Sequence, residues 1–202
     1  MRRLPLAAMV LVAACAVAPD PRLPGSPAAM PESGGRPGVP AVELLEDAFA
    51  WSADRRLMWS DFRGRPVVTS GAVALTAYYV AYDLPCHAGR FAPSVVSRFL
   101  PHASWVKADH LLEPQAVQTL RHEQTHFDLS EVLARRALAD LRAVDRPCDL
   151  DTAGIQPVLD GFGRRDAEIQ RQYDRETGHG TDPRRQQEWD RRVETWLRET
   201  PR

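Results

Sequence analysis

Apolar residues recur with a helical period through the C-terminal half of the chain. Over residues 114–144 they return every three or four positions, which predicts a long amphipathic helix. Similar spacing predicts a second helix over residues 155–175 and a third over residues 183–198. We therefore expect three consecutive helices in this half of the chain.

The preceding segments have the pattern of strands. Residues 67–83 are rich in Val, Thr and Tyr, which favour one or two strands of an antiparallel sheet. Residues 95–100 and 103–107 are expected to add another pair. Because strands precede helices rather than alternating with them, the pattern predicts an α+β fold, with a small antiparallel sheet followed by three helices.

The N-terminus has the layout of a bacterial export signal. Two arginines precede an apolar run over residues 4–14 that is too short to span a bilayer. The run ends in Val-Ala-Ala-Cys at 12–15, which resembles a lipobox, where signal peptidase cuts before a cysteine that carries a lipid. We therefore expect a signal peptide over residues 1–14 and a lipid on Cys15. The alternative is an ordinary secreted protein in which Cys15 is an odd thiol.

The segment after the signal is expected to be a tether. Residues 15–41 are rich in Pro, Gly, Ser and Ala and hold hardly any large apolar residue, so they cannot bury enough surface to fold. The folded domain should then span residues 42–202. With the lipid anchor at Cys15, this order predicts an exported protein held in the bacterial cell envelope, facing the periplasm from the outer membrane.

Composition and cysteine usage narrow the functional classes. The chain has 202 residues, 44% of them hydrophobic and 26% charged, as is ordinary for one globular domain. Its formal net charge of −1 gives no indication of nucleic-acid binding. With Cys15 lipidated, Cys86 and Cys148 remain, and in an exported protein we expect them to form a disulfide. The alternative is two buried free thiols.

The predicted first helix carries a His-Glu-x-x-His motif at residues 122–126. His122 and His126 are four positions apart, so on a helix they lie about 40° apart on one face and can reach one ion. Zinc binds neutral imidazole well, and Glu123 could take a proton from a water that the metal holds. The pattern therefore predicts a Zn2+ site with Glu123 as its catalytic base.

A helical wheel places both histidines with the apolar residues of this helix, whereas Gln124, Asp128 and Glu131 fall on the opposite side, where we expect solvent. Asp128 and Glu131 are therefore expected to form charge pairs rather than bind the metal. The alternative to a metal site is that His122 and His126 are ordinary helix histidines that form hydrogen bonds.

A third zinc ligand must come from another element. His179 stands between two glycines just past a predicted helix end, where the backbone can aim an imidazole, and we expect it to be this ligand. Glu176 and Asp174 are its rivals. Tyr173 could donate a hydrogen bond to an oxyanion, or it could be a packed helix aromatic.

Three segments resemble those of DUF922, a family of bacterial proteins of unknown function regarded as predicted secreted zinc-dependent proteases. They are the sequence Trp-Ser-Asp-Phe at 59–62, the motif helix at 122–128, and the closing segment from Tyr173 through His179 to Trp189. The resemblance covers residues 57–196. It implies a zincin-like fold and a role for the closing His-Gly segment, and it carries no substrate.

Taken together, these features predict a zinc-dependent hydrolase, most simply a peptidase acting on peptides or proteins of the cell envelope. Two alternatives stay open at this point. One is a non-catalytic envelope lipoprotein whose zinc is structural and which binds a partner or cell-wall material. The other is a zinc hydrolase that cleaves a different bond, such as an amide in cell-wall material.

Overall fold

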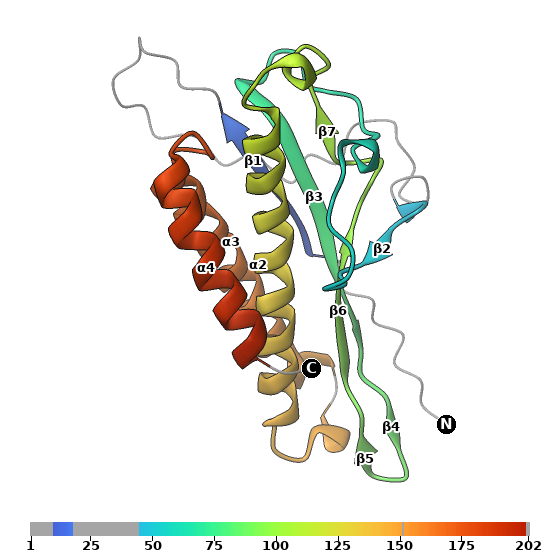
Figure 1. Ribbon diagram of the computed structural model, residues 1–202. Coiled ribbons are helices and arrows are strands. Elements are labelled where there is room, and N and C mark those ends of the chain that lie inside the picture. Colours follow the sequence, from blue (N-terminus) through green and yellow to red (C-terminus); the bar gives the residue numbers. More distant parts are fainter. Residues whose placement is uncertain (1–9, 18–44, 151, 201–202) are drawn as a thin grey trace.

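The computed structural model of the protein describes residues 10–17, 45–150 and 152–200, which form an antiparallel sheet with three helices against one face (Figure 1). The expected α+β fold, a small antiparallel sheet followed by three helices, is therefore confirmed. Residues 1–9 of the predicted signal and residues 18–41 of the predicted tether lie outside the described residues. Within the described residues, no helix combines the length and apolarity needed to cross a bilayer.

The main sheet is organised around one long strand, β3 (Ala72–Asp83). The strand order is β1-β3-β6-β2, with β1 (Val10–Val17), β6 (Ser94–Phe99) and β2 (Phe49–Ala50), while β7 (Trp105–Val106) pairs with the start of β3. All these pairings are antiparallel. The first predicted strand thus begins later than expected, because residues 67–70 form a turn closed by the Ser70 N–H on the Val67 carbonyl.

Strand β1 lies in the region predicted to hold the signal peptide and the start of the tether. It pairs with β3 from Val10 opposite Val80 to Val17 opposite Ala72. Small and β-branched apolar residues suit a strand as well as the apolar run of an export signal. Cleavage before Cys15 stays a prediction, and it would remove residues 10–14 of this strand.

The helices match the three that the apolar period predicts. They are α2 (Ala116–Arg142), α3 (Thr152–Thr177) and α4 (Pro183–Glu199). Helix α2 contacts β3 and β6 on one side and α3 and α4 on the other, so it is the central helix of the fold (Figure 1). Helix α4 begins where Asp182 accepts hydrogen bonds from the backbone N–H groups of Arg184 and Arg185, with Pro183 in the first turn.

One prediction from the helical wheel is wrong. Gln124, Asp128 and Glu131 are buried rather than solvated, because the chain around residues 51–57 covers their side of α2. The Trp51 indole N–H donates to Asp128 at 2.7 Å, and the Leu57 backbone N–H donates to Gln124 at 2.7 Å. A helix covered on several sides does not have the single solvated face that the wheel assumes.

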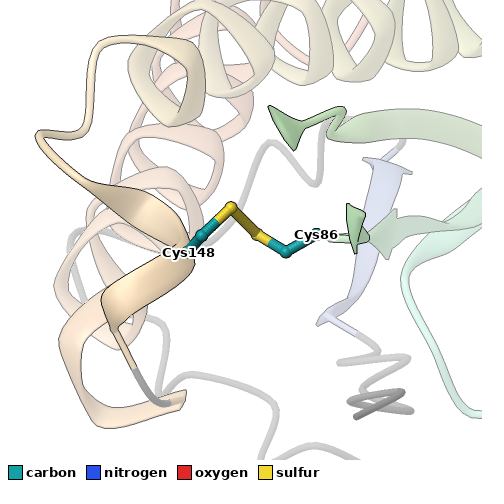
Figure 2. Close-up of a disulfide and its surroundings, with 2 residues drawn as sticks. All are labelled: Cys86 and Cys148. Carbon is teal, nitrogen blue, oxygen red and sulfur yellow. A yellow bond between two sulfur atoms is a disulfide. The ribbon is translucent and has the colours of Figure 1, made fainter. Parts of the chain in front are cut away.

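The far end of the molecule is closed by a disulfide. Strands β4 (Cys86–His87) and β5 (Arg90–Phe91) form a short hairpin, and Cys86 is bonded to Cys148 in the connection between α2 and α3 (Figure 2). The two Cα atoms are 5.7 Å apart. The predicted disulfide is therefore confirmed. Beside it lies an apolar cluster formed by the sheet, α2 and α3, which includes Val80, Val95, Leu133, Leu138, Leu141, Ile155, Leu159 and Phe162.

Candidate metal centre

Helix α2 presents His122 and His126 to the interior one turn apart. Both side chains are fully buried, and their Nε2 atoms lie 3.0 Å from each other. The four-residue spacing of the motif therefore brings the two imidazoles together, as the sequence predicts.

Asp174, from the last turns of α3, supplies the third group. Its Oδ1 lies 3.1 Å from Nε2 of His122 and 3.0 Å from Nε2 of His126. The three potential ligand atoms all lie within 4.8 Å of one another, and no other such group of His, Cys, Asp or Glu occurs among the described residues. Asp174, considered from the sequence as a rival of His179, is thus the residue that joins the two histidines in this group.

His179 lies beside this group but outside it. Helix α3 ends in a Schellman motif, in which the Gly178 N–H bonds to the Arg175 carbonyl and the His179 N–H bonds to the Asp174 carbonyl at 2.7 Å. The His179 imidazole is 38% exposed, and its Nδ1 is 3.8 Å from Asp174 Oδ1. Residues 178–180 do adopt positive φ, as the two glycines allow, but the group that could hold a metal ion contains Asp174 and not His179.

The other rival, Glu176, faces away from the cluster. Its side chain accepts hydrogen bonds from the Trp189 indole at 2.9 Å and from Gln172 at 2.7 Å. Successive helical residues diverge by about 100°, so Glu176 lies about 200° around α3 from Asp174. It therefore takes no part in the site.

The turn after α3 packs directly on the first histidine. Residues 178–180 all have positive φ, and Gly180, at +80°, lies so close that a Cβ there would be 2.8 Å from Cγ of His122. Only a residue without a side chain fits this position without displacement. The glycine therefore fixes where the imidazole can lie.

Glu123 is buried beside the histidines, and within the part of the chain that the structure describes neither oxygen of its carboxylate has a hydrogen-bond partner. Burial raises the pKa of Glu123 to about 7, although His126 and Thr76 partly oppose that rise. The Thr76 hydroxyl, on β3, donates instead to the Glu123 backbone carbonyl at 3.3 Å. A buried carboxylate without a hydrogen-bond partner is costly to the fold, so its presence here needs an explanation.

The charge states of the cluster depend on one another. Burial and the neighbouring His126 lower the pKa of His122 to about 4. Burial also opposes charge on His126, but Asp174 outweighs it and raises the pKa of His126. Burial likewise opposes ionisation of Asp174, yet the two histidines hold its pKa well below the usual range. These shifts favour the ionised form of Asp174 and make His126 easier to protonate than His122.

Tyr173 is fully buried and its ring stacks on His122, with centroids 4.6 Å apart and the planes tilted by 19°. The hydroxyl donates to Gln186 at 2.8 Å and lies 3.3 Å from the His122 carbonyl. This geometry favours the packed aromatic considered from the sequence. Hydrogen bonding by Tyr173 to an oxyanion stays a prediction.

Two buried glutamines, Gln170 on α3 and Gln186 on α4, contact the histidines and were not identified from the sequence. Gln170 lies 2.6 Å from Nδ1 of His126, and Gln186 lies 3.1 Å from Nδ1 of His122. A signal was available, because both glutamines fall in phase with buried aromatics of their own helices, Tyr173 and Trp189.

The sequence model of a family described as "Bacterial protein of unknown function (DUF922)" matches residues 63–180, more than half of the chain. The chain belongs to this family. The DUF922 match contains both motif histidines, Glu123 and Asp174, whereas Gln186 lies beyond its end. No curated protein and no solved structure matches the chain.

Proposed function

We propose that this protein is a zinc-dependent hydrolase that cleaves peptide bonds outside the cytoplasm. One observation carries the proposal, namely that His122, His126 and Asp174 converge within 4.8 Å beside the buried, unpartnered carboxylate of Glu123. Structural histidines satisfied by hydrogen bonds would not require an ionisable neighbour of this kind. Two histidines, a third ligand and an adjacent glutamate are the set that zinc hydrolases use.

The side chains fit zinc in both chemistry and number. Imidazole nitrogen and carboxylate oxygen are normal zinc ligands, and catalytic sites combine three protein ligands with one open position. Among the described residues three groups converge, not the four that close a structural site. This count supports an enzyme over a protein that holds zinc for structural reasons.

Zinc held by these residues would polarise a carbonyl and make water a stronger acid. Glu123 would then accept the proton of the attacking water and pass it to the leaving amine, the role of a general base followed by a general acid. Its pKa, raised by burial to about 7, suits transfer in both directions near neutral pH.

The proposed location and substrate rest on other features. The disulfide between Cys86 and Cys148 supports an oxidising compartment, as expected for an exported protein. The signal peptide and lipid at Cys15 are part of the proposal and would place the domain at the membrane surface of the cell envelope. Peptides or proteins of that envelope are the proposed substrates, because the His-Glu-x-x-His arrangement is that of metalloproteases.

The experiment compares two substitutions of buried glutamates on α2. Glu123→Gln keeps the ligands and removes the base, whereas Glu131→Gln makes the same change two turns away, where Glu131 pairs with Arg135 at 2.7 Å. Zinc content is measured by elemental analysis and hydrolysis by mass spectrometry of a peptide library. We expect Glu123→Gln to retain zinc and to lose about 10²–10⁴-fold in rate, the usual contribution of a general acid–base group.

The control should keep both zinc and activity. Glu123→Gln protein that hydrolyses peptides as fast as the natural chain would overturn the mechanism. Purified protein that binds less than half an equivalent of zinc after zinc is supplied would overturn the metal site itself.

A further inference from the structure

Each motif histidine meets a glutamine side-chain oxygen at the ring nitrogen that faces away from Asp174. Nδ1 of His126 lies 2.6 Å from Oε1 of Gln170, and Nδ1 of His122 lies 3.1 Å from Oε1 of Gln186. Both glutamines are at least 97% buried, so water does not compete for these contacts. Which atom donates depends on how each amide is oriented.

The orientation of Gln170 is fixed by its other contacts. Its Nε2 group donates to the His126 backbone carbonyl at 3.2 Å, and a carbonyl can only accept. The same group donates to the Tyr78 hydroxyl at 2.7 Å, while that hydroxyl donates to Asp166 at 2.8 Å. The amide oxygen must therefore face His126, and the ring must donate its Nδ1 proton to it.

Gln186 is oriented in the same way by a different neighbour. Its Nε2 group donates to the Asp190 carboxylate at 2.7 Å, which again requires a donor. Its oxygen also accepts the Tyr173 hydroxyl at 2.8 Å. The amide oxygen therefore faces His122, whose Nδ1 must carry the proton.

When both protons are at Nδ1, the lone pairs at the two Nε2 atoms and the Asp174 oxygens converge with no donor among them. The Nε2 atoms are only 3.0 Å apart, which is unfavourable unless a cation or a shared proton lies between them. We propose that Gln170 and Gln186 are positioning residues that hold both histidines in the Nδ1–H tautomer, so that both Nε2 atoms are directed at one divalent cation.

This inference deepens the proposed function and rests on the same metal site. Partners of this kind commonly orient the imidazoles of metal centres, and their removal lowers metal affinity by about 10–100-fold. Here the partners are neutral amides from two separate helices, one for each histidine. Helix α3 therefore contributes both a ligand, Asp174, and the residue that orients His126, whereas α4 contributes only orientation.

The test measures tautomers directly in the full-length, metal-free protein. Long-range ¹H–¹⁵N NMR spectra of the histidine rings, recorded with a chelator present, distinguish Nδ1–H from Nε2–H imidazole. Gln170→Met and Gln186→Met remove the acceptor with little change of shape. Gln124→Met is the matched control, because Gln124 is a buried glutamine of α2 that contacts Leu57 and Asp128 and neither histidine.

We expect His122 and His126 of the natural chain to show Nδ1–H signals when neutral. Gln170→Met should lower the Nδ1–H fraction of His126, Gln186→Met should lower that of His122, and Gln124→Met should change neither. This crossed pattern separates positioning from general destabilisation. A neutral His122 or His126 ring that carries its proton at Nε2 in the natural chain, or a ring unaffected by its own glutamine variant, would overturn the proposal.

A second measurement uses the metal. Cobalt(II) titration, followed by the visible absorption of the bound ion, should show about 10–100-fold weaker binding for each Met variant and normal binding for Gln124→Met. Each Met variant tests its own ring against the Gln124→Met control, so the test stays valid if one of the two fails to fold. Because the NMR readout needs neither metal nor substrate, it can succeed even where the proposed hydrolase activity fails.

Discussion

Most buried side chains of the first half of α2 are polar, whereas most of those in its second half are apolar and belong to the cluster that includes Phe162. The first region holds the two histidines, two glutamines and Asp174 in direct contact. Near the second, the disulfide between Cys86 and Cys148 links the β4–β5 hairpin to the connection between α2 and α3 (Figure 2).

The two regions contribute differently to the stability of the protein and to its proposed function. Apolar burial stabilises the fold with little demand on orientation, at about 25 cal/mol for each Å² removed from water. Buried polar groups stabilise only when every donor and acceptor is matched, and Glu123 is not matched. The region around Phe162 therefore stabilises the fold, and the region around the histidines is where we propose the chemistry takes place.

The largest expected effect is at the third ligand. Asp174→Ala should weaken zinc binding by more than the 10–100-fold that an outer partner contributes, because it removes a direct ligand. His179→Ala, two residues beyond α3, should weaken zinc binding far less, since His179 lies outside the converging group. Competition titrations with a zinc chelator measure both affinities. Equal losses of zinc affinity in Asp174→Ala and His179→Ala would show that His179 also binds the metal.

Removing the disulfide tests the stability of the apolar region around Phe162. Replacing Cys86 and Cys148 by serine opens a covalent loop of 62 residues and should lower the free energy of unfolding by about 4 kcal/mol. Urea denaturation measures this change. Zinc affinity of the folded double variant should equal that of the natural chain, and a parallel fall in affinity would show that the two regions are coupled.

Asp166 is a buried carboxylate whose ionisation should make the stability of the fold depend on pH. Burial raises its pKa from 3.8 to about 6, although hydrogen bonds from Tyr78 and Gln170 oppose this. The folded state therefore binds the proton more tightly than the unfolded state, and stability falls as the pH rises from about 4 to 6. The Asp166→Asn variant has no carboxylate to ionise, so it avoids this loss of stability. The Tyr78 hydroxyl can still donate to its amide oxygen.

We expect Asp166→Asn to be more stable than the natural chain by about 3 kcal/mol above pH 6 and equally stable below pH 4. Urea denaturation of the metal-free proteins from pH 4 to pH 8 tests this. A stability difference that is constant across that range would contradict the proposed titration.

The smallest effect compares two glycines with similar backbone angles. Gly89, in the β4–β5 hairpin, has φ +76° with open space around its would-be Cβ, whereas Gly180 has φ +80° and meets His122. Gly89→Ala should cost about 1–2 kcal/mol from the backbone alone. Gly180→Ala should cost more and should also weaken zinc binding. Equal unfolding free energies and unchanged zinc affinity in both variants would show that His122 moves to accommodate the added Cβ without loss of stability or of zinc binding.

Much of the fold could be predicted from the sequence, because its signals are local. The apolar period of α2, α3 and α4 placed the three helices within a few residues of their observed ends. The four-residue spacing placed His122 and His126 together, since both lie on one helix. Short strands such as β2, β4 and β5, with two residues each, are too brief to leave a pattern.

The rest of the site depends on contacts between elements distant in sequence. Asp174 and His179 were close rivals on local grounds, and only the packing of α3 against α2 selects Asp174. Gln170 and Gln186 were not identified from the sequence, because amides are usually exposed and their burial depends on how α3 and α4 pack against α2. The burial of Asp128 likewise follows from Trp51, 77 positions away.

The bond between Cys86 and Cys148 also makes part of the chain a closed ring. Residues 86–148 include His122, Glu123 and His126, whereas Asp174 lies outside. A single peptide-bond cut inside the ring leaves both pieces covalently joined, so a nicked molecule would separate only after reduction. A cut after Cys148 and before Asp174 leaves Asp174 with no covalent connection to the two histidines, so that only packing holds it beside them. Proteolysis can therefore detach part of the centre through that connection more directly than through the motif helix.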